Sequence, residues 1–252
     1  MQKAIVVIPA RYGSTRLPGK ALAEIEGKPL VQHVYDRARL SQKASDCLIA
    51  TDDERIKQAC ERFGSKVVMT SPQHNSGTDR MAEVALKTDA DVYVNVQGDE
   101  PFVDPAAVDL LINMMFENPS IKMGTLKRQI DSYEGFVNPN NARVVCDKDD
   151  YALYFSRAPI PYLNRSEFET PGKCWPVFKH VGMYSFRRDF LLEFSRMPQS
   201  ALELTERLEQ LRALEAGVRI KALTTNYESI SVETLADLER VRALFAQRRQ
   251  SN

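Results

Sequence analysis

The sequence has no long apolar run, no excess of one charge and no cysteine motif. None of its stretches approaches the roughly 18 continuous apolar residues of a membrane-spanning helix, so we expect no membrane association. Its 34 lysines and arginines balance 34 aspartates and glutamates, which argues against a protein that coats nucleic acid or an anionic membrane surface. Because the first apolar run begins at residue 4, we also expect no signal peptide.

Cysteine is scarce, and no two cysteines form a C-x-x-C pair. Such scattered positions are typical of reduced thiols in the cytoplasm and not of a disulfide scaffold or a zinc site. Apolar residues make up 43% and charged residues 27% of the chain, close to a globular average, which excludes a disordered or fibrous protein. The composition therefore predicts a globular, cytoplasmic protein. Its cysteines are Cys47, Cys60, Cys146 and Cys174.

Short β-rich runs alternate with helical patterns over the first two thirds of the chain, which predicts βα units around a mostly parallel sheet. Residues 4–8 (AIVVI) are all apolar, as expected for a strand buried on both faces. Pro29 is expected at the first position of a helix, where its missing N–H is not needed. Further strands are predicted at 47–50, 66–69 and 92–96, and further helices at 53–63, 79–87 and 105–115.

The pattern changes after about residue 134, where strands are predicted without long helices between them. Leucines at helical spacing then predict one helix over 202–216, ended by Gly217. We therefore predict an α/β fold in which a mostly parallel, doubly wound sheet carries a smaller β-rich insertion. The late strands are predicted at 143–146, 152–155, 182–186 and 219–223, and the closing helix at 234–248.

Three loops at predicted strand ends carry unusual chemistry, and ligands of such sheets bind beyond the carboxyl ends of the strands. Residues 9–20 (PARYGSTRLPGK) combine three cations with two glycines, a composition suited to phosphate. This loop matches neither a Walker A motif nor G-x-G-x-x-G, so an ordinary solvated basic loop is the alternative.

The other two loops are residues 97–101 (QGDEP) and 76–80 (SGTDR). A carboxylate that follows a buried strand and faces a phosphate loop is where a magnesium ligand would lie, because Mg²⁺ takes one or two carboxylates and completes its shell with phosphates and water. The alternatives are an acidic turn for the first loop and a plain helix cap for the second.

Seven motifs together closely resemble the 3-deoxy-manno-octulosonate (Kdo) cytidylyltransferase family, in the right order and over nearly the whole chain. Each motif is modest alone, and the first is shared with acylneuraminate cytidylyltransferases and other sugar nucleotidyltransferases. The motifs are PARYGSTRLPGK, TDDERI, SGTDR, NVQGDEP, ALYFSR, H-x-G-x-Y within 179–184, and LEQLR.

The resemblance implies a Rossmann-like nucleotidyltransferase fold, usually a homodimer, that uses CTP and Mg²⁺. The implied reaction transfers CMP to Kdo and releases pyrophosphate, which activates the sugar for lipopolysaccharide biosynthesis. The resemblance also implies one domain over 1–252. Its nucleotide-binding part would span about 1–133 plus the C-terminal strand and helix, and its sugar-binding and dimerisation part about 134–217.

Motif by motif, the resemblance also implies which residues form the site. Arg11 and Lys20, helped by Arg16, would hold the triphosphate, and Asp99 would be a metal ligand. We expect Arg11, Lys20 and Asp99 to be the catalytic residues, since they act on the reacting phosphates. Ala10, Ser76 and Gly77 would recognise the cytosine and ribose, and Gln97 would lie between the nucleotide and the sugar. The residues of the sugar pocket would be Arg157, His180, Tyr184, Glu209 and Gln210.

The sugar-side residue types suit an acidic keto-sugar. Arg157 can bind a carboxylate through two parallel hydrogen bonds, and Glu209 and Gln210 can bind hydroxyl groups. The alternative for Glu209 and Gln210 is the solvated face of an amphipathic helix. For His180 the alternative is a purely structural role.

One position departs from the family pattern. The family usually has V-D-T-x-x-D-L near its end, whose first Asp is a second metal ligand, whereas residues 231–238 here read SVETLADL. Glu233 keeps the carboxylate but adds a methylene, which affects either the metal geometry or the choice of sugar. The alternative substrates are the 8-amino analogue of Kdo and a sialic-acid-like sugar. A non-catalytic nucleotide-binding regulator is the alternative of a different class.

Overall fold

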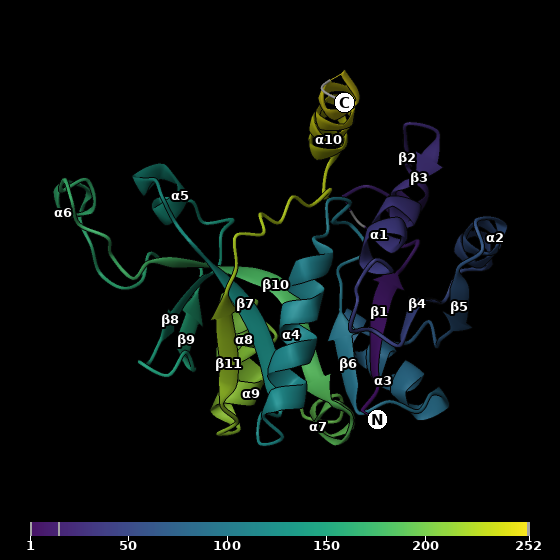
Figure 1. Cartoon of the computed structure of the whole chain (residues 1–252), viewed down its shortest axis with the longest axis horizontal. Coiled ribbons are helices and arrows are strands. Elements are labelled where there is room, and N and C mark those ends of the chain that lie inside the picture. Colours follow the sequence, from purple (N-terminus) through teal and green to yellow (C-terminus); the bar gives the residue numbers. More distant parts are fainter. Residues whose placement is uncertain (1, 15, 251–252) are drawn as a thin grey trace.

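The computed structural model describes residues 2–14 and 16–250, and its centre is a nine-stranded sheet (Figure 1). Along the order β11-β7-β10-β6-β1-β4-β5, only β10 runs antiparallel to its neighbours within the described chain. The strands are β1 (Ala4–Ala10), β4 (Asp46–Thr51), β5 (Lys66–Met69), β6 (Val92–Asn95), β7 (Met123–Gln129), β8 (Arg143–Cys146), β9 (Ala152–Ser156), β10 (Phe178–Arg187) and β11 (Ile220–Thr224), with a small hairpin of β2 (Glu24–Ile25) and β3 (Lys28–Pro29).

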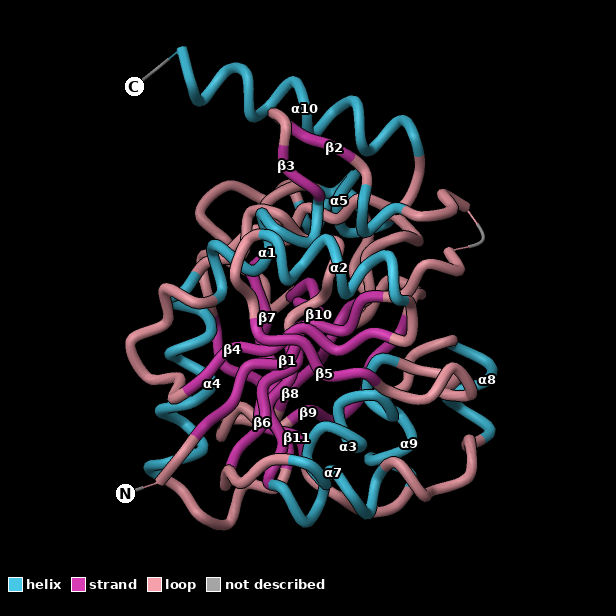
Figure 2. Tube along the Cα trace, turned by 90° about the vertical axis from the view of Figure 1, so that its right-hand side faces the viewer, coloured by secondary structure: helices cyan, strands magenta, loops and turns pink. Residues whose placement is uncertain are grey.

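Helices cover both faces of this sheet. Figure 2 shows α1 and α2 on one side of the strands, with α3, α7 and α9 on the other. The helices are α1 (Leu30–Ala38), α2 (Glu54–Arg62), α3 (Gly77–Lys87), α4 (Pro105–Glu117), α5 (Tyr133–Val137), α6 (Arg165–Phe168), α7 (Arg188–Phe194), α8 (Ala201–Glu206), α9 (Leu211–Glu215), α10 (Leu235–Gln250) and the 3-10 turn η1 (Lys20–Leu22).

Strand β1 shows why the sheet is buried on both faces. Successive side chains of a strand point to opposite faces. Val6 and Ile8 therefore join the core under α1 and α4, while Ile5 and Val7 join the core under α3 and α7. The predicted doubly wound α/β fold is confirmed.

The predicted β-rich insertion is also present. Strands β8 and β9 form a hairpin that pairs with the start of β10 through Phe178 and Val144. In Figure 1 this hairpin and helices α5 and α6 lie on the left of the molecule, away from α1 and α2. None of the helices among the described residues combines the length and the apolar character needed to cross a membrane.

Three local predictions were wrong. Pro29 is not inside α1 but caps it, since the helix begins at Leu30. Strand β7 was not predicted at all, although it lies in the middle of the sheet beside β10 and β11. The helix expected over 202–216 is two short helices, α8 and α9, separated by a link at residues 207–210.

Candidate active site

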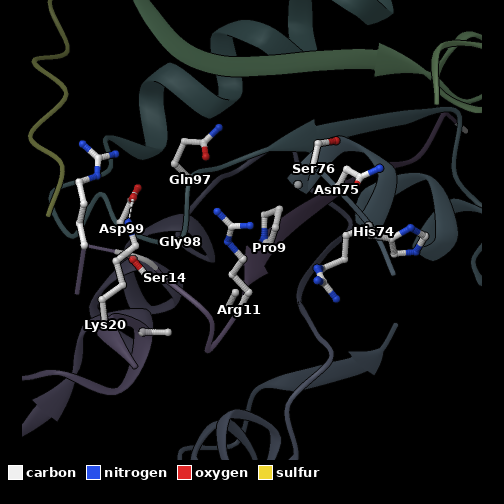
Figure 3. A pocket seen from close by; sticks show the side chains of 15 residues that line it. Pro9, Arg11, Ser14, Lys20, His74, Asn75, Ser76, Gln97, Gly98 and Asp99 are labelled. Atoms are coloured by element: carbon white, nitrogen blue, oxygen red, sulfur yellow. Dashed lines mark hydrogen bonds and ion pairs between the residues drawn. The ribbon is translucent and has the colours of Figure 1, made fainter. Parts of the chain in front are cut away.

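The three motif loops meet at the carboxyl ends of β1 and β6, as expected for a parallel sheet. They line a first cavity, which comprises residues from 9–21, 74–80 and 97–99. In the view of Figure 3, Lys20 and Asp99 lie together at one end of this cavity, His74 lies at the other, and Arg11 lies between them. The predicted nucleotide-binding residues among its lining are Ala10, Arg11, Arg16, Lys20, Ser76, Gly77 and Gln97, and the predicted metal ligand Asp99 lines it as well.

Gly98 explains how closely these loops approach each other. A Cβ atom at Gly98 would lie 2.5 Å from the carbonyl oxygen of Pro9, closer than any side chain allows. Only glycine lets the loop after β6 pack against the end of β1. This contact brings Asp99 to the cations of the first loop.

Each predicted metal carboxylate is paired with a cation of the first loop. Lys20 Nζ donates to Asp99 Oδ2 at 2.5 Å and to the Val232 carbonyl oxygen at 3.2 Å. Arg16 forms an ion pair with Glu233. Arg11, in contrast, lines the cavity without a hydrogen bond or ion pair to another described residue.

The two carboxylates suit Mg²⁺. The Val232 backbone N–H donates to the Asp99 carbonyl oxygen at 2.9 Å, so the segment that carries Glu233 is fixed beside Asp99. Within residues 2–14 and 16–250, three or more His, Cys, Asp or Glu side chains nowhere form a complete metal site. A pair of hard oxygen ligands is nevertheless what Mg²⁺ uses when substrate phosphates and water complete its shell.

Ser76 is both a helix cap and a cavity residue. Its side chain accepts a hydrogen bond from the Asp79 backbone N–H at 3.1 Å and Asp79 reciprocates, which forms a capping box at the start of α3. The helix cap considered from the sequence is therefore real. The N-terminus of this eleven-residue helix lies at the cavity, where its N–H groups favour an anion.

The lining residues of the first cavity that were not predicted as site residues include His74, Asn75 and Arg80. His74 Nε2 contacts Glu83 Oε2 at 2.6 Å, and the buried Arg80 is held by Asp52 at 3.2 Å. The available signal was their position in or directly before the SGTDR motif.

A second cavity adjoins the first and shares Ser76, Gly77 and Gln97 with it. Its far wall is the segment 195–212, and Tyr184 and Glu209 both line it. The break in the predicted helix creates this wall, because Arg207 has a left-handed backbone (φ 56°) that ends α8. Glu209 and Gln210 thus lie in the link and not on a solvated helix face.

The link residues are held by hydrogen bonds and still have unused hydrogen-bonding atoms. Glu209 Oε2 accepts from Thr78 Oγ1 at 2.6 Å, and Gln210 Oε1 accepts from the Tyr184 hydroxyl at 2.9 Å. Glu209 Oε1 and Gln210 Nε2 are buried without a hydrogen-bonding partner among the described residues, although Arg212 Nη2 forms an ion pair with Glu209 Oε1 at 3.9 Å. Burial raises the pKa of the Glu209 carboxyl, while hydrogen bonds from Thr78 and Ser76 oppose that shift.

His180 lies behind Tyr184 and lines neither cavity. Its Nε2 contacts Thr125 Oγ1 at 2.9 Å, and its ring packs 5.3 Å from the Tyr184 ring. Burial, aided by the charge of Lys179, lowers the pKa of His180 to about 3, so the imidazole is neutral near pH 7. This position supports Tyr184, and direct contact of His180 with a sugar stays a prediction.

Arg157 lies apart from Tyr184 and Glu209. It lines a third, open cavity together with Arg16 and Glu233. Its Nε donates to the Glu206 carbonyl oxygen at 3.1 Å, and its backbone N–H donates to the Glu206 carboxylate at 2.8 Å. Arg207 borders both the second and the third cavity, so the two are neighbours.

Several known proteins are similar to this chain in sequence and in fold. The sequence profile of a family described as cytidylyltransferase matches residues 5–220. A 3-deoxy-manno-octulosonate cytidylyltransferase of Geobacter sulfurreducens is 52% identical over 241 residues, which cover 93% of this chain and 96% of that relative. A relative of the same name from Solibacter usitatus is 50% identical over 244 residues, with 97% and 95% covered.

Two solved structures are similar to the structure of this chain. A CMP:2-keto-3-deoxy-manno-octonic acid synthetase complexed with CTP has a TM-score of 0.91 and 45% identity, and the match covers 98% of this chain and 100% of that one. A cytidylyltransferase from Leptospira borgpetersenii, at 16% identity and a TM-score of 0.64, shares the fold; the match covers 98% of this chain and 88% of that one. This chain therefore belongs to the cytidylyltransferase family.

Proposed function

We propose that this protein transfers CMP from CTP to 3-deoxy-manno-octulosonate and releases pyrophosphate. The observation that carries the proposal is the adjacency of two different cavities. The first offers cations and the Asp99 carboxylate to a triphosphate, and the second offers buried hydrogen-bonding groups to a polyhydroxylated sugar. Glu233 lies in the third cavity, which shares Arg16 with the first. The relatives described above are named for this sugar, so its 8-amino analogue is not favoured.

In the proposed reaction the anomeric hydroxyl group of the sugar loses its proton to water and its oxygen forms a bond to the α-phosphorus of CTP. The bond between the α-phosphorus and the bridging oxygen breaks, and pyrophosphate leaves with that oxygen in line. The protein contributes by positioning the reactants and neutralising charge. Gln97, which borders both cavities, lies where the two substrates would meet.

Arg11 and Lys20 supply the positive charge for the phosphates. Arg11 is free to bind, whereas Lys20 must exchange Asp99 for a phosphate oxygen. Asp99 and Glu233 would hold Mg²⁺, which when bound supplies further charge to the triphosphate and lowers the pKa of a nearby hydroxyl group. The exchange leaves the Asp99 carboxylate facing the phosphates without its lysine.

On the sugar side, Tyr184, Glu209 and Gln210 bind hydroxyl groups, and Arg157 binds the carboxylate from the neighbouring third cavity. His180 keeps the Tyr184 ring in place. We assign sugar binding and dimerisation to residues of about 134–217 and nucleotide binding to the remainder.

We also propose a homodimer in the cytoplasm. Strand β9 pairs with β8 at the end of the hairpin and carries Leu153, which is 63% exposed, and Tyr162 beyond it is 88% exposed. Apolar side chains exposed on an edge strand favour a subunit contact there. The four unpaired cysteines suit a reducing compartment.

A pyrophosphate-release assay tests the function. The purified chain is given CTP with Kdo, its 8-amino analogue or a sialic acid, at a fixed magnesium concentration. We expect release that needs both CTP and Kdo and is fastest with Kdo. CTP binding without release with any sugar would favour a non-catalytic regulator and contradict the proposal.

A further inference from the structure

Asn95 is a buried polar residue for which the proposed reaction has so far supplied no role. It ends strand β6 and is 2% exposed, and its Oδ1 atom has no hydrogen-bonding partner within residues 2–14 and 16–250. A buried amide oxygen without a partner destabilises a folded protein, so such an atom calls for an explanation.

The position of Asn95 suggests an explanation for its unused oxygen atom. The register of the sheet places Asn95 directly opposite Tyr184 of β10, and paired residues of antiparallel strands point to the same face. Both side chains line the second cavity. On its other side, Asn95 Nδ2 lies 3.8 Å from where a Cβ of Gly77 would be. Asn95 therefore lies between the start of α3 and the sugar-side tyrosine.

Asn95 shares this cavity with Glu209. Within the described residues, the buried Glu209 Oε1 has no hydrogen-bonding partner, although Arg212 Nη2 forms an ion pair with it at 3.9 Å. Asn95 Oδ1 and Glu209 Oε1 both accept hydrogen bonds. A ligand that satisfies both must bring two donors, which adjacent hydroxyl groups supply.

We propose that Asn95 is a further substrate-binding residue whose carboxamide forms a hydrogen bond with a hydroxyl group of the sugar. The inference rests on the proposed function and extends it. Asn95 lines the second cavity and not the first, whereas Gln97, two residues later on the chain, lines both. Asn95 therefore contributes to recognition of the sugar and not of CTP.

Ser185 provides a matched control. Its Oγ is likewise fully buried without a hydrogen-bonding partner in the described part of the chain, and it lies on β10 next to Tyr184. Adjacent strand residues point to opposite faces, and Ser185 lines none of the three cavities. Replacing Ser185 by alanine therefore removes a buried polar atom that has no hydrogen-bonding partner, as replacing Asn95 does, but it removes no contact to the sugar.

The test replaces Asn95 with leucine, which has a similar shape and no polar atoms. We expect Asn95→Leu to raise KM for Kdo about tenfold or more, because a site built to bind a hydroxyl group discriminates strongly through that bond. KM for CTP should change less than about twofold, and Tm should not fall, because the removed oxygen had no partner in the free protein. Ser185→Ala should leave both KM values unchanged.

Sugar analogues that each lack one hydroxyl group identify the partner. With the analogue that lacks the contacted hydroxyl, wild type and Asn95→Leu should have equal KM values. Should Asn95→Leu not fold, Asn95→Asp keeps an acceptor oxygen at the same place and should retain a KM for Kdo nearer to wild type than Asn95→Ser.

Two outcomes would overturn the inference. One is a KM for Kdo in Asn95→Leu that equals that of wild type. The other is an equal rise in KM for both substrates together with a lower Tm, which would show a structural residue. A wild-type protein that releases no pyrophosphate from CTP and Kdo would instead contradict the proposed function itself, so the two failures are distinguishable.

Discussion

The two sides of the active site satisfy their polar groups in opposite ways. On the phosphate side the charges are paired with each other, Lys20 with Asp99 and Arg16 with Glu233. On the sugar side Glu209 and Gln210 are held by protein hydrogen bonds through one atom, and a second, buried atom of each has no hydrogen-bonding partner among the described residues. Phosphate binding by Lys20 and Arg16 must therefore exchange partners, while sugar binding adds hydrogen bonds to groups already in place.

The environment of each side explains the difference. The side chains of Arg16 and Glu233 are 63% and 43% exposed and those of Lys20 and Asp99 are each 21% exposed, so water reaches both pairs during an exchange. Gln210 is 2% exposed and is fixed by Tyr184 from the sheet. Buried, fixed groups give specificity, and more solvated charges give attraction for a highly charged ligand.

The largest effect is expected from the phosphate side. Lys20→Ala removes a charge that would act on the transferred phosphate, and kcat/KM should fall on the order of a hundredfold or more. Steady-state pyrophosphate release measures it, with Lys28→Ala as control because Lys28 is an exposed lysine paired with Asp36. Wild-type turnover in Lys20→Ala would refute the assigned role.

The second largest effect on activity is expected from Glu233→Gln. It removes one of the two carboxylates assigned to Mg²⁺, so activity should fall about tenfold or more and the magnesium concentration for half-maximal rate should rise. Binding of Mn²⁺ followed by electron paramagnetic resonance should weaken in parallel. Glu233→Asp should retain activity. Glu239→Gln, on the exposed face of α10 beside Arg242, is the control. Unchanged magnesium dependence in Glu233→Gln would leave Asp99 as the sole assigned ligand.

Arg157→Lys tests whether the third cavity belongs to the sugar side. Lysine keeps the charge but lacks the planar fork, so KM for Kdo should rise several-fold, about 1 kcal/mol in binding, and KM for CTP should not. Arg219→Lys is the control, because Arg219 pairs with Asp147 on the surface. An equal rise in both KM values would mean that Arg157 only holds the Glu206 segment.

The smallest effect on activity near neutral pH is expected at the buried His180, where the prediction concerns stability instead. Its pKa of about 3 lies below the ordinary value of 6.5, so the unfolded chain binds one more proton between these values. The free energy of unfolding should therefore be fully maintained above pH 6.5 and decrease as the pH falls toward 3. The slope from this group is at most about 1.4 kcal/mol per pH unit. Urea denaturation of wild type and His180→Gln measures it.

In His180→Gln the free energy of unfolding should lack the part of the pH dependence that comes from His180, since glutamine does not titrate. Curves that stay parallel from pH 7.5 to pH 5 would show that His180 is not buried as a neutral group. Kinetic pH profiles near neutrality should be the same in both proteins, because His180 does not titrate there.

Two failures of prediction show where local sequence is insufficient. Strand β7 contains Gly124, Thr125, Lys127 and Arg128, and this composition hides a strand. In the fold, Lys127 is buried and paired with Asp150 at 2.6 Å, and β10 and β11 flank the strand on both sides. Partners distant in sequence stabilise the strand, so no local pattern reveals it.

The second failure is the link between α8 and α9. Leucine spacing over 202–216 favours one helix, but Leu204 is 59% exposed and does not join the core. Arg212 forms a buried ion pair with Glu203, and Glu209 bonds to Thr78 on α3. These tertiary contacts outweigh helix propensity, which is weak per residue.

The sequence by itself determined the α/β class, the order of the motifs and the phosphate loop. These depend on hydrophobic period and on residue types that lie close together along the chain. Only the tertiary structure decided which distant groups meet. It placed the backbone of Val232, the residue before Glu233, against Asp99 and put Arg157 and Tyr184 in different cavities. It also left Asn95 Oδ1 in the sugar-side cavity without a hydrogen-bonding partner among the described residues. Pairing and burial are properties of contacts between remote segments, so they exist only once the chain has folded.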